Sequence, residues 1–236
     1  MDIEFWSDVV CPWCYIGKRR FEKALAQFPH RDTVDIHWRS FELDPDAEQQ
    51  YSNTLEEMLA QKYGVTLEQA AQMNARVAGQ AAAEGLEYHL DQAKRGNTFN
   101  AHRLVQLAAE RGVQGAVAER LMHAYFTEGQ PIGDAETLAR LVAEAGLSAD
   151  EARATLAGDD YADAVRADER RAAMLGIHGV PFLVIDERYA VSGAQPTEVF
   201  LKALETAWNA AQPLTIGGGD ADNDDSDVCD DGSCAI

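Results

Sequence analysis

The sequence has 236 residues, 46% of them hydrophobic, which is enough for one large domain or for a domain that carries an insertion. Its formal net charge of −20 disfavours binding to nucleic acid or to anionic membranes, because phosphate groups would be repelled. No run of about 18 apolar residues is present, and the opening MDIEFWSDVV lacks a basic leader followed by an apolar segment. We therefore expect a cytoplasmic protein without a membrane span.

The N-terminal part has the pattern of a β-α-β unit. Residues 2–6 alternate as a strand, a helical pattern runs from Pro12 to about Phe28, and residues 34–41 alternate again. Pro12 suits the first turn of a helix, where its missing N–H costs nothing, and Pro29 ends the helical pattern. A right-handed crossover would make the two strands parallel.

A long helical segment follows, from about Thr54 to Leu175, for which the pattern predicts about six helices. Capping boxes begin at Thr54 and Ser148, and Asp134 can cap the helix that follows it. Alanine is abundant here and β-branched runs are scarce, as is typical of helices.

Strand character returns near the C-terminus, followed by one more helix. The pattern predicts a short buried strand at 182–185, a second strand at 189–191 and an amphipathic helix at 195–210. Beyond Pro213 the periodicity ends, and the seven aspartates among residues 217–236, with no basic residue, are typical of a flexible acidic tail.

These elements predict an α/β, thioredoxin-like fold (β-α-β … β-β-α) with a large all-helical insertion. The thioredoxin-like domain would comprise residues 1–45 and 177–212, and the helical insertion residues 46–176. Residues 213–236 would form the acidic tail, which contains a Cys-x4-Cys pair.

Cys11-Pro12-Trp13-Cys14 lies where the first strand leads into the helix. Free N–H groups and the positive end of the helix dipole would stabilise a thiolate on Cys11 at this point. Cys14, one turn further on, is placed to attack a mixed disulfide on Cys11 and release the product. Because a Cys-x-x-Cys within a β-α-β unit is typical of thioredoxin-like redox chemistry, we assign Cys11 as the attacking thiol and Cys14 as the resolving thiol.

A zinc site is the alternative for this pair, because zinc half-sites also use Cys-x-x-Cys. Cys229 and Cys234 could supply two further ligands. The proline and tryptophan between the first two cysteines are not needed for zinc, and we therefore favour redox chemistry without a metal. A zinc-stabilised interaction module would lose its fold with a chelator.

Pro181 directly precedes the short apolar strand at 182–185. A cis Val180–Pro181 bond would expose the Val180 backbone beside the cysteines, where an extended substrate could pair with it. An ordinary trans proline that opens a strand is the alternative. Trp13 could contribute an apolar surface for the same substrate.

Three segments in this order resemble the DsbA-like thioredoxin-fold oxidoreductases of the FrnE type: SDVVCPWCYIGKRRFEKAL, NTFNAHRL and GVPFLVID. The resemblance extends from Asp2 to Asn209 and implies a dithiol, Cys11 and Cys14, that faces a cis-proline loop at Pro181. A member of this family from Deinococcus has an extra C-terminal Cys-x4-Cys pair, a spacing that Cys229 and Cys234 match. The resemblance implies a thiol-disulfide oxidoreductase acting on protein disulfides or thiols, with a redox-active disulfide and no other cofactor.

A neighbouring branch of this fold contains glutathione-dependent isomerases and kappa-type transferases that act on small aromatic molecules. Those proteins resemble the NTFNAHRL segment but typically have serine where this chain has Cys11. Asn97 and His102 of that segment could line the substrate cleft, or could be a helix cap and a helix-surface histidine. Glutathione is a candidate reductant in either case, and the chain could be a monomer or a homodimer.

The tail pair, Cys229 and Cys234, presents a separate question. The loop between them is short, so a disulfide there would stabilise the fold little. The segment between Ala210 and Cys229 would span roughly 25 Å as a flexible coil, which could bring the pair to the active-site face. We therefore hypothesise a relay in which the tail exchanges disulfides with Cys11 and Cys14; two incidental thiols are the alternative.

Overall fold

A computed structural model of the chain describes residues 1–211, and the predicted tail with Cys229 and Cys234 lies outside these residues. Its four-stranded sheet has the order β2-β1-β3-β4. β1 (Asp2–Ser7) is parallel to β2 (Asp35–Ser40) and antiparallel to β3 (Phe182–Ile185), and β3 is antiparallel to β4 (Tyr189–Ser192). The predicted thioredoxin-like α/β fold, β-α-β … β-β-α with a helical insertion, is confirmed.

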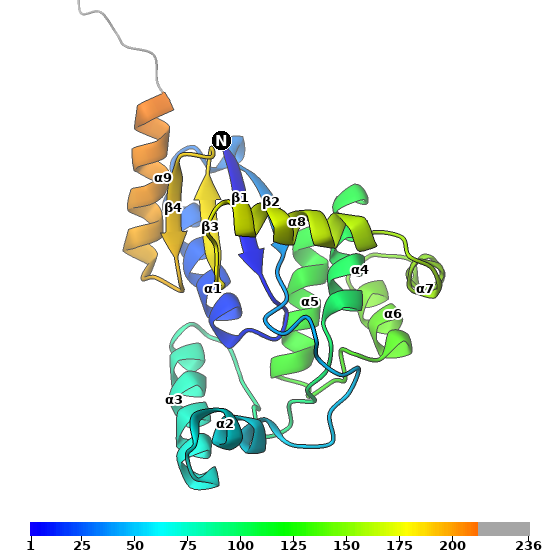
Figure 1. Cartoon of the computed structure of the whole chain (residues 1–236). Coiled ribbons are helices and arrows are strands. Elements are labelled where there is room, and N and C mark those ends of the chain that lie inside the picture. Colours follow the sequence, from blue (N-terminus) through cyan, green and yellow to red (C-terminus); the bar gives the residue numbers. More distant parts are fainter. Residues whose placement is uncertain (212–236) are drawn as a thin grey trace, which may run out of the picture.

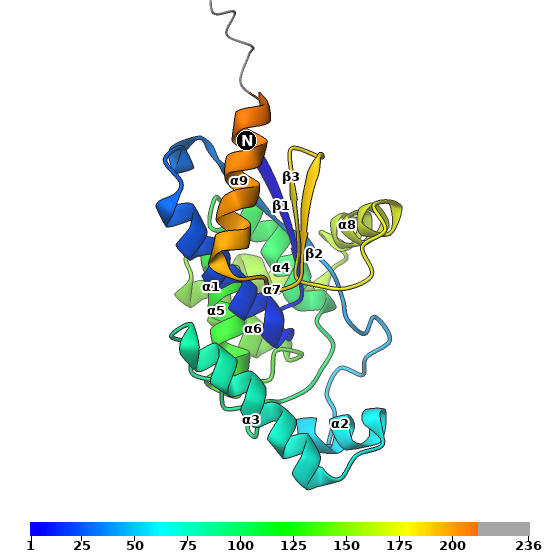
Figure 2. The ribbon, with the colours of Figure 1, turned by 90° about the vertical axis from the view of Figure 1, so that its left-hand side faces the viewer.

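Helices cover both faces of the sheet (Figures 1 and 2). α1 (Pro12–Gln27) and α9 (Thr197–Ala211) pack on one face, and α8 (Ala162–Met174) crosses the other. Because side chains alternate along a strand, β1 places Ile3 and Phe5 among the residues of the α1 side and Trp6 among those of the α8 side. All three side chains are fully buried.

The segment between β2 and β3 contains seven helices, one more than the approximate six predicted. Besides α8 these are α2 (Leu55–Tyr63), α3 (Leu67–Ala83), α4 (Phe99–Glu110), α5 (Gln114–Phe126), α6 (Ala135–Glu144) and α7 (Ala149–Ala157). A left-handed Gly64 ends α2 just before Thr66 caps α3, so only a short link separates these two helices. The predicted capping box at Thr54 and the cap at Asp134 are confirmed, and Ser148 caps α7 by accepting from the Glu151 N–H, without the reciprocal bond of a full box.

Most of the insertion shares its core with the sheet. One hydrophobic cluster joins residues of β1, α1 and α9 to residues of α4, α5, α6 and α7, so the division at residues 45 and 176 remains a prediction. The pair α2 and α3 stands below the sheet (Figure 2) and buries few side chains. α2 has no buried residue, and α3 buries only Ala70, Asn74 and Ala81. Within residues 1–211 we find no helix with the length and apolarity that crossing a bilayer requires.

Candidate active site

The two cysteines of the Cys-x-x-Cys motif lie at the start of α1. Cys11 is the N-cap residue, with extended backbone angles, and Pro12 follows in the first turn. The Cys11 N–H donates to the Asp8 carbonyl (3.1 Å), and the Cys14 N–H donates to the Cys11 carbonyl (3.0 Å). Cys11 is 4% exposed and Cys14 is completely buried, and both are free thiols. Cys11 is therefore the thiol that a substrate can reach.

The loop that precedes β3 lies directly against Cys11. The Val180–Pro181 peptide bond is cis, and the Cys11 Sγ donates to the Val180 carbonyl over 3.6 Å. Gly17 of α1 makes room for the proline ring, since a Cβ at this position would come within 3.0 Å of Pro181 Cγ. The structure thus brings Cys11 together with Val180 and Pro181, which lie far from it in the sequence.

The surroundings of Cys14 favour its neutral thiol. Burial, and then the neighbouring Cys11, raise the pKa of Cys14 well above its usual range. Tyr88 packs beside the two cysteines. Its hydroxyl donates to the Pro12 carbonyl over 2.8 Å, and its ring stacks on Phe126. Burial also raises the pKa of Tyr88, which therefore remains a hydrogen-bond donor.

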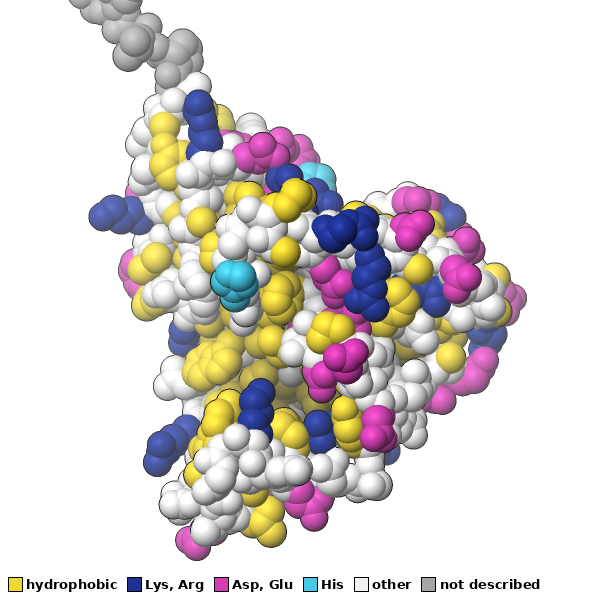
Figure 3. Space-filling model, in the orientation of Figure 1, with side chains coloured by type: hydrophobic (Ala, Val, Ile, Leu, Met, Phe, Trp, Pro, Cys, Tyr) yellow, Lys and Arg dark blue, Asp and Glu magenta, His cyan; other side chains and the backbone are white. Residues whose placement is uncertain are grey.

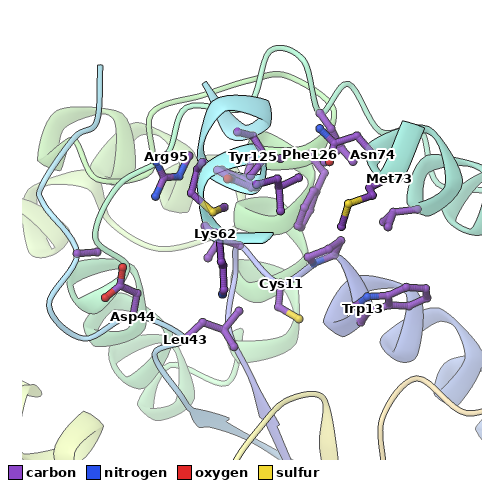
Figure 4. A pocket seen from close by; sticks show the side chains of 18 of the residues that line it. Cys11, Trp13, Leu43, Asp44, Lys62, Met73, Asn74, Arg95, Tyr125 and Phe126 are labelled. Atoms are coloured by element: carbon purple, nitrogen blue, oxygen red, sulfur yellow. The ribbon is translucent and has the colours of Figure 1, made fainter. Parts of the chain in front are cut away.

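A pocket of about 470 Å³ opens beside Cys11 (Figure 4). Its walls come from the start of α1, the loop after β2, α2, α3, the segment before α4 and the end of α5, and hydrophobic side chains gather in this hollow (Figure 3). Most lining residues are apolar, including Leu43, Leu55, Leu59, Met73 and Phe126. This size and composition suit an organic ligand or a short peptide segment rather than a metal ion.

Few polar side chains face this apolar pocket. The Arg95 guanidinium lies 4.1 Å from the centre of the Tyr51 ring and donates to Asn53 Oδ1 (2.8 Å). The exposed Lys62 is the second cation of the lining. Asn74 is 8% exposed, and its Nδ2 has no hydrogen-bond partner among residues 1–211. Trp13, which the sequence analysis proposed for substrate contact, is 40% exposed and lines the pocket.

The remaining predicted substrate-binding residues, Asn97 and His102, do not belong to the pocket lining. Asn97 accepts from the Phe99 N–H (2.8 Å) and donates to the Ala47 carbonyl, so its side chain holds the backbone before α4. His102 is buried rather than on the helix surface, and its Nε2 lies 3.4 Å from Asp8 Oδ1. It therefore supports the loop between β1 and α1, through Asp8, and does not line the pocket.

Several site residues were missed in the sequence analysis: Gly17, Tyr51, Asn74, Tyr88 and Arg95. Gly17 is the one with a local signal, a glycine inside a helix, where alanine would be more favourable. The other four belong to the insertion, and their positions depend on how its helices pack beside α1. No periodicity in the sequence distinguishes them from other polar or aromatic residues.

Comparison with known proteins places this site in a family. The model of the DSBA-like thioredoxin domain matches residues 2–205. A solved structure described as a probable DsbA oxidoreductase from Streptomyces coelicolor is 47% identical to the chain, with a TM-score of 0.87 and coverage of 100% of this chain and 99% of that one. An uncharacterized Bacillus subtilis protein, YwbO, is 28% identical over 214 residues, which are 86% of this chain and 94% of YwbO.

A more distant structure shares the fold. A cytosolic disulfide reductase from Pseudomonas aeruginosa, DsbM, solved with GSH, is 18% identical with a TM-score of 0.63, over 89% of this chain and 100% of that one. The chain therefore belongs to the family of DSBA-like thioredoxin domains.

Proposed function

We propose that the protein is a thiol-disulfide oxidoreductase that acts on the disulfides or thiols of proteins. The observation that carries this proposal is the position of Cys11: at the N-terminus of α1, in contact with the Val180 carbonyl, and on the wall of an apolar pocket. An extended substrate could pair with the backbone at Val180 while its sulfur reaches Cys11.

The reaction proceeds in two exchanges. The Cys11 thiolate attacks a substrate disulfide, forms a Cys11–substrate disulfide and releases one substrate sulfur, which takes up a proton. Cys14 then loses its proton and attacks Cys11 Sγ, which forms the Cys11–Cys14 disulfide and releases the second substrate thiol. Two electrons and two protons pass from enzyme to substrate. An external thiol, for which glutathione is a candidate, returns the enzyme to its dithiol form by the reverse exchanges.

The direction and place of this reaction are part of the proposal. In a reducing cytoplasm we expect reduction of protein disulfides. The Streptomyces coelicolor structure at 47% identity, described as a probable DsbA oxidoreductase, supports the reaction class. The likeness to FrnE-type proteins in three sequence segments supports assignment to that branch.

Reduction of insulin disulfides tests the proposal directly. Wild type should reduce insulin with an added thiol donor, and Cys11→Ser should not. Cys14→Ser should accumulate substrates as mixed disulfides on Cys11, because the resolving thiol is missing. Absence of reduction by wild type, or full activity of Cys11→Ser, would defeat the proposal. Isomerisation of a small aromatic molecule with glutathione, surviving the loss of Cys14, would instead support the glutathione-dependent alternative.

The tail relay is a second part of this proposal, and its residues, Cys229 and Cys234, lie outside the described part of the chain. The pair would exchange disulfides with Cys11 and Cys14 by the same chemistry. Replacing both tail cysteines by serine should slow reoxidation of the active-site dithiol; equal rates would argue for incidental thiols. Metal analysis of the full chain addresses the zinc alternative, which needs these same two residues.

A further inference from the structure

Asn74, in the lining of the pocket, has a buried side-chain nitrogen without a hydrogen-bond partner in the described part of the protein. Four buried side-chain atoms in residues 1–211 lack a hydrogen bond: Glu42 Oε1, Asn74 Nδ2, His102 Nε2 and Arg120 Nη1. Only Asn74 belongs to a residue that lines the pocket of Cys11. Because an unpaired buried amide destabilises the fold, the position of Asn74 in the pocket lining favours a partner from outside residues 1–211, such as a bound substrate.

Most of the other lining residues of α2 and α3 are apolar. They are Met73 and Val77 of α3 and Leu55, Met58 and Leu59 of α2, beside Lys62 and Tyr63. A side-chain amide carries both a donor and an acceptor, and a peptide group offers the complementary acceptor and donor. A hydrogen bond in such surroundings discriminates strongly, because either partner left unpaired loses its solvation.

We propose that Asn74 binds a peptide amide of the segment that flanks the substrate cysteine, and so positions the substrate sulfur for Cys11. This inference rests on the proposed function and adds a specificity-determining residue to it. Both a polypeptide and glutathione carry amide groups next to a cysteine, so the chemistry that Asn74 recognises is common to the two. Val180, which lines the same pocket and contacts Cys11, would hold the substrate backbone at a second point.

The replacement of Asn74 by leucine distinguishes a role in substrate binding from a role in the stability of the fold. Leucine has a similar size and no polar group, so Asn74→Leu removes an unpaired buried amide and should leave the melting temperature equal or higher. The same change removes the substrate hydrogen bond. We expect kcat/KM for a disulfide-linked peptide to fall roughly tenfold, the range for a lost neutral hydrogen bond in a desolvated site.

The experiment compares wild type, Asn74→Leu, Asn74→Ala and the control Gln72→Ala, an exposed residue of the same helix outside the pocket. Substrates are a disulfide-linked peptide and oxidised glutathione, and modification of Cys11 by methyl methanethiolsulfonate, which has no amide, reports thiol reactivity. Both Asn74 variants should lose kcat/KM with unchanged thiol reactivity, and Gln72→Ala should match wild type. A loss with the peptide alone, with glutathione alone or with both supports the inference and identifies the amide source.

Two results would overturn the role of Asn74. Wild-type kcat/KM in both Asn74 variants would show that no substrate amide binds there. A lower melting temperature with lower thiol reactivity in Asn74→Leu would show that the residue only supports the fold. If wild type turned over neither substrate, the proposed function would be wrong, and the role of Asn74 would be wrong with it. If wild type is active, a wild-type rate in both Asn74 variants contradicts only the role of Asn74.

Discussion

The two walls of the pocket differ in how firmly the chain holds them. The sheet wall, formed by Cys11, Trp13 and Val180, rests on completely or almost completely buried side chains such as Phe5, Ile16 and Phe21. The helical wall, formed by α2 and α3, has no buried residue in α2 and three in α3. Since local stability follows buried contacts, the reacting atoms lie on the rigid wall and the recognition surface on the adaptable one.

The helical wall is anchored at one end. Glu84, which follows α3, forms ion pairs of 2.6 Å with both Arg20 and Lys23 of α1. Burial would raise the pKa of Glu84, but these two cations lower it below its usual range. α2 has no comparable ion pair within residues 1–211, and its own capping box is its main local support. The adaptable part of the wall is therefore α2.

Substitutions in the two walls should differ most in their effect on the rate of disulfide turnover. Cys11→Ser should lower disulfide turnover at least roughly a thousandfold, because Cys14, the other thiol among residues 1–211, is completely buried. Leu59→Ala on the helical wall should raise KM a few fold and leave kcat nearly unchanged, since it removes only apolar contact. Steady-state kinetics with a peptide disulfide measures both. Equal losses in the two variants would contradict the division of roles.

Stability should show the next largest contrast. Phe21→Ala should lower the free energy of unfolding by about 3 to 5 kcal/mol, because its ring is 1% exposed and packs against Phe5 and Phe200. Leu59→Ala should cost about 1 kcal/mol or less, because Leu59 is half-buried. Urea unfolding of the two variants checks this. Similar losses would mean that the helical wall is part of the cooperative core.

A change of intermediate size should appear in the pH dependence of stability, because two titratable side chains, Glu42 and His102, are buried outside the pocket lining. Burial raises the pKa of Glu42 to about 7 from its usual 4.5, although the ion pair with Arg166 opposes this. Burial would lower the pKa of His102, but Asp8 raises it above the usual 6.5. The folded state therefore holds both protons more tightly than the unfolded state, and stability should fall as pH rises, between about 4.5 and 7 for Glu42 and from about 6.5 upward for His102.

Glu42→Gln removes one of these two contributions. Its free energy of unfolding should therefore decrease less than that of wild type between pH 5 and pH 7, the approximate window that linkage sets for this carboxyl. Urea unfolding at several pH values measures the slope, with the exposed Asp150→Asn as a control. If the free energy of unfolding of Glu42→Gln changed with pH as steeply as that of wild type, the contribution of Glu42 would be contradicted.

The smallest effect should come from the cap of α2. The Thr54 hydroxyl accepts from the Glu57 N–H, and Glu57 in turn accepts from the Thr54 N–H. Thr54→Ala should cost about 1 kcal/mol of helix stability, and because α2 buries little, this should appear as faster hydrogen exchange in α2. The global free energy of unfolding should change little. Faster exchange throughout the sheet instead would show that α2 and the core unfold together.

Much of the sheet and of its dithiol could be predicted because the signals are local. Alternation identified β1 and β2, the caps identified helix starts, and Cys11 and Cys14 lie within one turn of the same helix. The helical wall could not be predicted to the same degree. Asn74 and Arg95 are separated from Cys11 by sixty residues or more, and only packing brings them to one pocket.

The amino-acid sequence by itself determined the order of the elements, the position of the Cys-x-x-Cys motif at a strand-to-helix junction and the proline that opens β3. Only the tertiary structure decided which residues of the insertion share a pocket with Cys11: Asn74 lines it, while Asn97 holds a loop and His102 contacts Asp8 outside the lining. The physical reason is that periodicity and capping act within a few residues, whereas the pocket depends on how distant helices pack against the sheet.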